Sequence, residues 1–138
     1  MQGLQKLEQF PVDSKLFLPP LPIDTATGRY LEKFIETLGG HDMGNMKIYQ
    51  TQNLWDASMA WNIAKYTKKH PKEKILQING RFHSDEKLGL IAQLTKYSPK
   101  LKVANISCFS IADFNGGDWQ QYSNLGDYII ITTAAKAK

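Results

Sequence analysis

The sequence is poor in cysteine and contains no long apolar run. Cys108 is the single cysteine among 138 residues, so no internal disulfide can form and no cysteine-rich metal site is present. No apolar run approaches the roughly 18–20 residues that a membrane span needs. Residues 1–6 lack the basic start and apolar stretch of a signal peptide. We therefore expect no disulfide framework and no transmembrane segment, and the sequence leaves the cellular location open.

Positive charge is only slightly in excess. Lysine and arginine number 17 against 13 aspartate and glutamate, and the excess is local, because five lysines lie within residues 65–74 around His70 and Pro71. A nucleic-acid footprint is broader and interleaved with stacking aromatic residues. Lysines at a helix C-terminus complement the helix dipole and stay solvated. The sequence therefore predicts no nucleic-acid partner.

The length and the 42% hydrophobic content predict one ordered domain over residues 1–138. Its first part, residues 1–22, is predicted to be a short helix around Leu4 and Leu7 followed by an extended, proline-rich connector. Proline fixes the backbone and lacks an N–H, so Pro19, Pro20 and Pro22 exclude a helix interior or a central strand there.

Apolar periodicity then predicts three helices and three strands. The helices are expected from Thr25 or Thr27 to Leu38, from 47 to 69, and from 85 to 96, and the strands at 75–78, 101–109 and 127–133. With the N-terminal helix, the order α-α-α-β-α-β-β predicts an α/β fold, a mostly parallel sheet flanked by helices. Residues 74–109 read as a right-handed βαβ crossover, with Cys108 as a small core residue.

Chemically active side chains gather in the turn after the strand at 75–78. Gly80, Arg81 and His83 lie between a predicted strand and a predicted helix, where α/β folds place their ligand sites. His83 is either a site residue or a histidine bonded to neighbouring backbone. Arg81 suits a carboxylate ligand, or is a solvated surface residue.

Other residues have side chains that can ligate haem iron, which accepts histidine, methionine or tyrosine. They are His41, Met43, Met46 and Tyr49. Methionines at such positions are more often fillers of a loop or core than ligands. Trp55 and Asp56 lie within the long predicted helix. Asp56 stands among apolar residues and needs a partner, for which Arg81 or a backbone donor is expected.

Three segments occur in one order: the Leu18-Pro-Pro connector, the stretch Tyr49-Gln-Thr-Gln-Asn-Leu-Trp-Asp-Ala-Ser-Met-Ala60, and Gly80-Arg-Phe-His83. In these, about residues 1–133 resemble the C-terminal half of the ChaN-like haem-binding uptake family of the Tiki superfamily. The superfamily resemblance implies two Gly-x-x-His motifs, of which only the second is present. The expected fold is therefore an incomplete EreA/ChaN-like domain.

The resemblance implies a haem-binding protein of iron or haem uptake without catalytic turnover, exported or membrane-anchored in bacteria, with a tyrosine-ligated haem. The expected cofactor-binding residues are Gly80, Arg81, His83, Tyr49, His41, Trp55 and Asp56. The alternative is a hydrolase, as in superfamily relatives, with His83 as general base or metal ligand. No Gly-x-Ser-x-Gly or His-Glu-x-x-His motif supports it. Strands left open by an incomplete domain predict a homo-oligomer.

Overall fold

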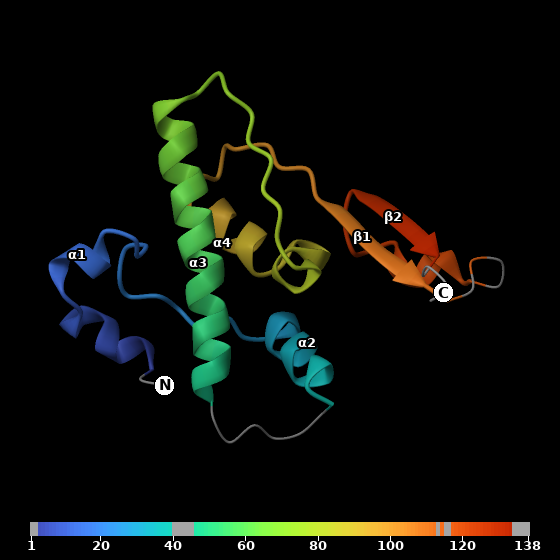
Figure 1. Ribbon diagram of the computed structural model, residues 1–138, viewed down its shortest axis with the longest axis horizontal. Helices are drawn as coiled ribbons and strands as arrows, with labels where there is room; N and C mark the ends of the chain where they lie inside the picture. Colours follow the sequence, from blue (N-terminus) through green and yellow to red (C-terminus); the bar gives the residue numbers. More distant parts are fainter. Residues whose placement is uncertain (1–2, 40–45, 113, 115–116, 134–138) are drawn as a thin grey trace, which may run out of the picture.

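The computed structural model describes residues 3–39, 46–112, 114 and 117–133. In this part of the chain, helices occupy the N-terminal two thirds and a small sheet follows (Figure 1). The elements are the 3-10 helices η1 (Leu4–Gln9), η2 (Arg81–His83), η3 (Asp85–Lys87) and η4 (Trp119–Tyr122), the α-helices α1 (Val12–Lys15), α2 (Arg29–Thr37), α3 (Met46–Lys69) and α4 (Leu90–Tyr97), and the strands β1 (Ile106–Ile111) and β2 (Tyr128–Thr133).

Helix α3 is the central element, with the other helices on its sides (Figure 1). Its 24 residues span about 36 Å at 1.5 Å per residue. The core lies where α3 meets α4, and there Ala60 and Ala64 pack against Leu94. Alanine leaves the backbone of α3 accessible, which lets α4 approach closely. The predicted helix at 47–69 is confirmed, and it ends just before His70 and Pro71, as proline requires.

The N-terminal elements follow the predictions in outline. The predicted helix from Thr25 or Thr27 to Leu38 is confirmed as α2, and the first predicted helix is present as the 3-10 helix η1. The four-residue helix α1 was not expected. No helix in the described ranges is long and apolar enough to cross a membrane.

The predicted strand at 75–78 is wrong. These residues are extended but unpaired, and the side chains of Leu76 and Ile78 are each 83% exposed. A strand is stable only when its N–H and C=O groups meet a neighbouring strand, and the sheet in the described chain contains only β1 and β2. The βαβ crossover over 74–109 is therefore also wrong, since its first strand does not join the sheet.

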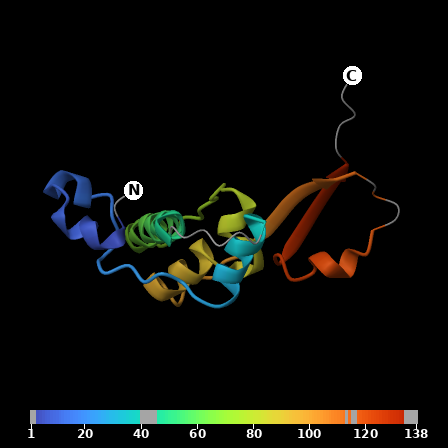
Figure 2. The same cartoon turned by 90° about the horizontal axis from the view of Figure 1, so that it is seen from below.

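The two C-terminal strands are confirmed, and they pair in parallel with Cys108 opposite Ile130. β1 begins later than the predicted strand at 101–109. Cys108 is exposed, so its prediction as a core residue is wrong. Neither face of this two-stranded sheet is fully covered, because the helices lie to one side of it (Figure 2). The fold is thus a helical body with a two-stranded parallel sheet.

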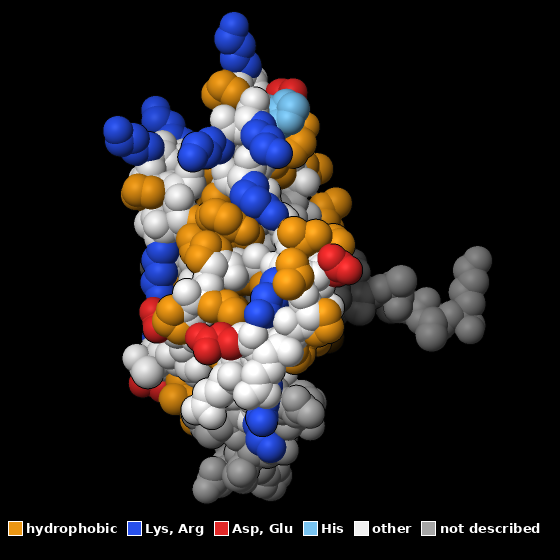
Figure 3. Space-filling view, turned by 90° about the vertical axis from the view of Figure 1, so that its left-hand side faces the viewer, with side chains coloured by type: hydrophobic (Ala, Val, Ile, Leu, Met, Phe, Trp, Pro, Cys, Tyr) orange, Lys and Arg blue, Asp and Glu red, His pale blue; other side chains and the backbone are white. Residues whose placement is uncertain are grey.

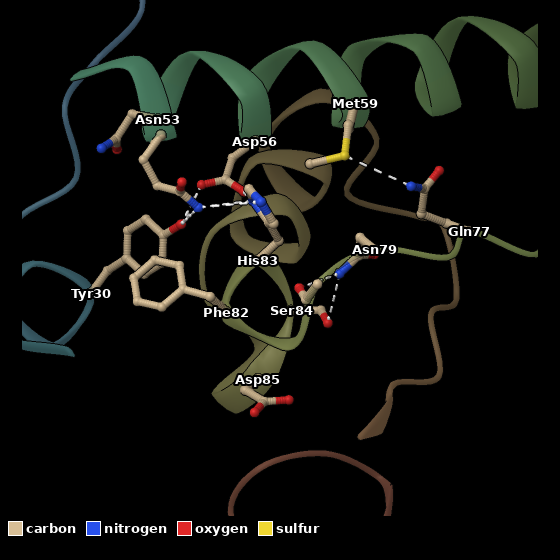
Figure 4. Close-up of polar contacts among 12 residues, drawn as sticks. Tyr30, Asn53, Asp56, Met59, Gln77, Asn79, Phe82, His83, Ser84 and Asp85 are labelled. Atoms are coloured by element: carbon tan, nitrogen blue, oxygen red, sulfur yellow. Dashed lines mark hydrogen bonds and ion pairs between the residues drawn. The ribbon is translucent and has the colours of Figure 1, made fainter. Parts of the chain in front are cut away.

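The predicted helix at 85–96 starts five residues late, at Leu90. Glu86 and Lys87 have φ of 63° and 55°, in the left-handed region that an α-helix excludes. The chain therefore makes two short 3-10 turns, η2 and η3, before α4 begins. These turns return the backbone to α3 and place His83 beneath it (Figure 4).

Candidate functional site

The site is built around the carboxylate of Asp56, which α3 holds with only 1% exposure. The hydroxyl of Tyr30, from α2, donates to Oδ2, and Nδ1 of His83, from η2, lies 2.7 Å from Oδ1 (Figure 4). The backbone N–H of Leu90, at the start of α4, also donates to this carboxylate. Asp56 thus joins four segments of the chain. Of the two partners expected for Asp56, a backbone donor is present and the pairing with Arg81 is wrong, since Arg81 pairs with Asp85.

The hydrogen bond to Asp56 sets the tautomer of His83. An ionised carboxylate can only accept, so the nitrogen beside it, Nδ1, carries a proton. The amide nitrogen of Gln52 lies 3.0 Å from Nδ1 and 3.4 Å from Nε2, against the ring. The His83 side chain is 17% exposed. A histidine whose other nitrogen donates to a carboxylate is the arrangement that metal-ligating histidines use.

Burial dominates the ionisation of the groups around His83. It raises the pKa of Asp56 above its ordinary value, and the hydrogen bonds from Tyr30 and His83 oppose that rise. Burial, then the bond to Asp56, raises the pKa of Tyr30 far above its usual range. Tyr30 is therefore a neutral donor at any physiological pH.

An aromatic surface adjoins His83. Trp55 is 55% exposed, and its ring centroid lies 6.3 Å from that of His83. On the inner side, Phe82 packs against Tyr30 at 5.2 Å between centroids. The inner ring supports the turn, while the indole presents an apolar face to the outside.

Gly80 and Arg81 lie next to His83 in sequence, but only Gly80 contacts His83. The carbonyl of Gly80 accepts from the N–H of His83 and closes the turn η2. The Nε atom of Arg81 lies 2.9 Å from Oδ2 of Asp85, and its guanidinium lies 4.3 Å from the centroid of Phe109 in β1. Arg81 therefore faces the sheet, with 43% of its side chain exposed.

Tyr49 lies seven residues before Asp56 on α3, with 1% exposure. Its hydroxyl donates to the carbonyl of Ala26 at 2.8 Å, and its ring packs on Phe34. Burial also raises the pKa of Tyr49. His41, Met43 and the side chain of Met46 lie outside the described residues. Of the expected residues, the structure thus brings together His83, Asp56 and Trp55.

Three residues of the site were not expected from the sequence: Tyr30, Gln52 and Gly89. The sequence pattern around Tyr30 and Gln52 could have indicated them. A tyrosine on the apolar face of a helix needs a partner for its hydroxyl, and Gln52 lies four residues before Asp56, on the same helix face. No pattern around Gly89 indicates it. Its φ is +51°, and a Cβ there would meet the carbonyl oxygen of His83 at 2.7 Å and the hydroxyl of Tyr30 at 2.8 Å.

A groove of about 530 Å³ runs between α3 and the extended segment after it. Met59, one of its lining residues, lies one helical turn beyond Trp55, so the groove continues the apolar face beside His83. The lysines and arginines visible in Figure 3 gather mainly towards the end where α3 ends. The groove is lined by Ser58, Met59, Asn62, Ile63, Tyr66, Lys74, Ile75 and Gln77.

One comparison with known proteins gives a match. The family model described as "Haem-binding uptake, Tiki superfamily, ChaN" matches residues 1–94, which include Asp56 and His83 and end before β1. No curated protein and no solved structure matches the chain.

Proposed function

Because this chain belongs to the haem-binding uptake family of the Tiki superfamily, ChaN, we propose that it binds haem, with Nε2 of His83 as the ligand to the iron. The observation that carries this proposal is the hydrogen bond between Asp56 and Nδ1 of His83. A carboxylate on the other nitrogen fixes the ring and raises the basicity of Nε2. The proposed role is haem binding in uptake, without turnover.

The donor set fits a haem iron better than a bare metal ion. A porphyrin supplies four nitrogens, so one or two axial side chains complete the coordination of the iron. Zinc sites need three or four protein ligands. Among the described residues, no group of three histidine, cysteine, aspartate or glutamate side chains could hold a metal ion. The haem proposal requires only one imidazole nitrogen that a hydrogen bond holds in place, and His83 supplies it.

His83 is a better candidate for the axial ligand than Tyr49. A tyrosine binds ferric iron as the phenolate, whereas burial raises the pKa of Tyr49 and its hydroxyl already donates to Ala26. In a neutral imidazole with its proton on Nδ1, the lone pair of Nε2 is the one that would bind iron. In this proposal the exposed face of Trp55 and the groove at Met59 cover the porphyrin, since cofactor sites are largely apolar. Arg81 pairs with Asp85 and faces the sheet, so it is not part of this proposed surface.

A titration of haemin followed by absorbance tests the proposal. We expect a shifted Soret band and quenched tryptophan fluorescence with the wild-type chain. His83→Ala should lose the shift, and Asp56→Asn should weaken binding roughly 10- to 100-fold, as losses of such partners do. His70→Ala is the matched control, because Nδ1 of His70 is also paired with a carboxylate, that of Glu73, although its side chain is more exposed, at 42%. It should bind haemin as the wild type does.

The outcomes separate haem binding from the choice of ligand. An unchanged Soret band with the wild-type chain overturns the proposal. A shift that survives in His83→Ala leaves haem binding in place and removes His83 as the ligand.

A hydrolase is the second candidate, and the same Asp56–His83 pair favours it, since a carboxylate-oriented histidine is also a general base. The neighbouring Ser84 adds no support, because its hydroxyl bonds to the Asn79 amide and, among the contacts of the described chain, does not donate to His83. We expect no turnover of generic esters or peptides. Turnover that His83→Ala abolishes and His70→Ala retains would support the hydrolase instead.

A further inference from the structure

Residues 74–79 form an extended segment with no strand beside it. The segment connects the end of α3 to η2 and is drawn in yellow-green in Figure 1. Its sequence, Lys-Ile-Leu-Gln-Ile-Asn, is that of a buried strand, yet Leu76 and Ile78 are each 83% exposed. Exposed apolar side chains on an extended, unpaired backbone are a template for pairing with another strand.

The sheet of the same chain lacks a strand on one edge of β1. β1 pairs on one edge with β2, and in the described chain its other edge has no partner. Parallel sheets are normally covered on both faces and have more than two strands. Here Ile106 is 52% exposed, Tyr128 64% and Ile130 50%. The sheet therefore lacks a neighbouring strand, and the chain contains a strand without a sheet.

Within the described part of one chain, the segment does not pair with β1. The Gln77 amide contacts the Met59 sulfur at 3.7 Å, and the bond from His83 to Asp56 fixes the far end of the segment beneath α3. The sheet projects to one side of the helices (Figure 2). The connection from the segment through α4 to β1 is nevertheless the kind that joins adjacent parallel strands.

We propose that residues 74–79 of one chain pair in parallel with the free edge of β1 in a second copy, and that the second copy returns the same contact. Each copy then both donates a strand and receives one, as a two-fold symmetric interface requires. A different protein would fill only one of the two defects. The occupant is therefore a second copy of this chain.

Apolar side chains flank the proposed strand pair. Leu76 and Ile78 of the segment are each 83% exposed, and Ile106 of β1 is 52% exposed. Tyr128 and Ile130 belong to β2, on the far side of β1, and are not part of this contact. Main-chain hydrogen bonds along the two added strands supply the rest of the interface.

Light scattering over a range of micromolar concentrations is the first test. The expected mass is twice the 15.7 kDa of one chain. The double variant Leu76→Lys, Ile78→Lys should have the mass of one chain, and it should fold, because both side chains are exposed before pairing. Circular dichroism checks the fold. A wild-type monomer overturns the proposal.

The matched control places the same charges elsewhere. Val12 and Leu16, in and after α1, are 76% and 67% exposed. The variant Val12→Lys, Leu16→Lys should remain a dimer. If it dissociates as well, or if the variant at Leu76 and Ile78 stays dimeric, the segment is not the interface and the proposal is overturned.

Disulfide trapping with the native Cys108 of β1 tests the strand pairing itself. Neighbouring strand residues face opposite sides of a sheet, so either Gln77→Cys or Ile78→Cys lies on the side of Cys108. Under mild oxidation one of these variants should cross-link to a covalent dimer, and the link should vanish when Cys108→Ser is added. A disulfide within one chain, or no link in either variant, overturns the proposal.

Discussion

The helical body and the sheet are both rich in apolar residues, but they bury them to very different degrees. In the body, Ala60 and Leu94 are 0% and 3% exposed, whereas Tyr128 and Ile130 in the sheet are 64% and 50% exposed. A helix satisfies its own backbone hydrogen bonds and needs only one packing partner. A strand needs neighbouring strands as well as cover on its faces. Equal hydrophobicity therefore yields a core only in the body.

The same division separates the site from the sheet. Asp56, His83, Tyr30 and Trp55 all belong to the helical body, and the family match over residues 1–94 ends within α4. The sheet touches the site region through Arg81, which lies over Phe109. Substitutions in the two regions should therefore have separable effects on stability and on haem binding.

The largest expected difference is in the response to removing an apolar side chain. Leu94→Ala should lower the free energy of unfolding by about 2–5 kcal/mol, because it leaves a cavity against Ala60 and Ala64. Ile130→Ala should cost less than about 1 kcal/mol, since its side chain is already half in water. Urea unfolding of the two variants measures the contrast. Equal losses would show that the sheet is packed as the body is.

A smaller effect is expected from the glycine that faces the site. Gly89→Ala puts a Cβ against His83 and Tyr30 at a positive φ, so we expect a loss of about 1–3 kcal/mol and weaker haemin binding. Thermal unfolding and the haemin titration measure the two effects.

Gly28 provides the matched control for Gly89. Its φ is +64°, but a Cβ there meets nothing within 4 Å. Gly28→Ala should therefore carry the backbone strain and keep haemin binding at the wild-type level. Identical binding losses in both variants would show that contact with His83 is not what Gly89 avoids.

The smallest effects are those of two carboxylates that should respond to pH in opposite directions. Burial raises the pKa of Asp56 above 3.8, so the folded state takes up a proton first. Its contribution to stability therefore improves as pH falls through the raised pKa towards 3.8. The hydrogen bond from Lys87 lowers the pKa of Asp127 below 3.8. Its contribution is present above that value and is lost as pH falls further.

Melting temperatures between neutral pH and about pH 3 check this contrast, with Asp56→Asn and Asp127→Asn as references. The advantage of the wild type over Asp56→Asn should grow on acidification to about pH 4. Its small advantage over Asp127→Asn should shrink below that pH. Parallel curves would remove the contrast between the two regions.

The elements that need only local signals could be predicted from the sequence. Helix α3 follows from its apolar stripe and from Pro71, and the strands at 101–109 and 127–133 follow from their apolar runs. The strand at 75–78 failed because pairing depends on a neighbour elsewhere in space, which no local pattern reports. The start of α4 was predicted five residues too early, because nothing in the residue types of Glu86 and Lys87 indicates their left-handed conformation.

The sequence predicted which residues lie at the site better than it predicted which of them contact one another. His83, Asp56 and Trp55 were expected as site residues from the family resemblance, whereas the partner of Asp56 was expected to be Arg81 or a backbone donor, and Tyr30 and His83 were not foreseen as its partners. The choice between Arg81 and Tyr30 depends on how α2 packs on α3. The sequence predicts which face of each helix is apolar. It does not determine which polar side chains on the two helices form hydrogen bonds.

The carboxylate of Asp56 has a consequence for how the protein opens. Tyr30, His83 and the N–H of Leu90 all donate to it, so no one of the segments that carry them can separate without leaving a buried polar group unsatisfied. Local fluctuations that expose this region must therefore release all of them at once. We expect the amide of Leu90 to exchange its hydrogen with solvent only through cooperative unfolding of the helical body. Amides at the outer edge of β2 should exchange through small local openings.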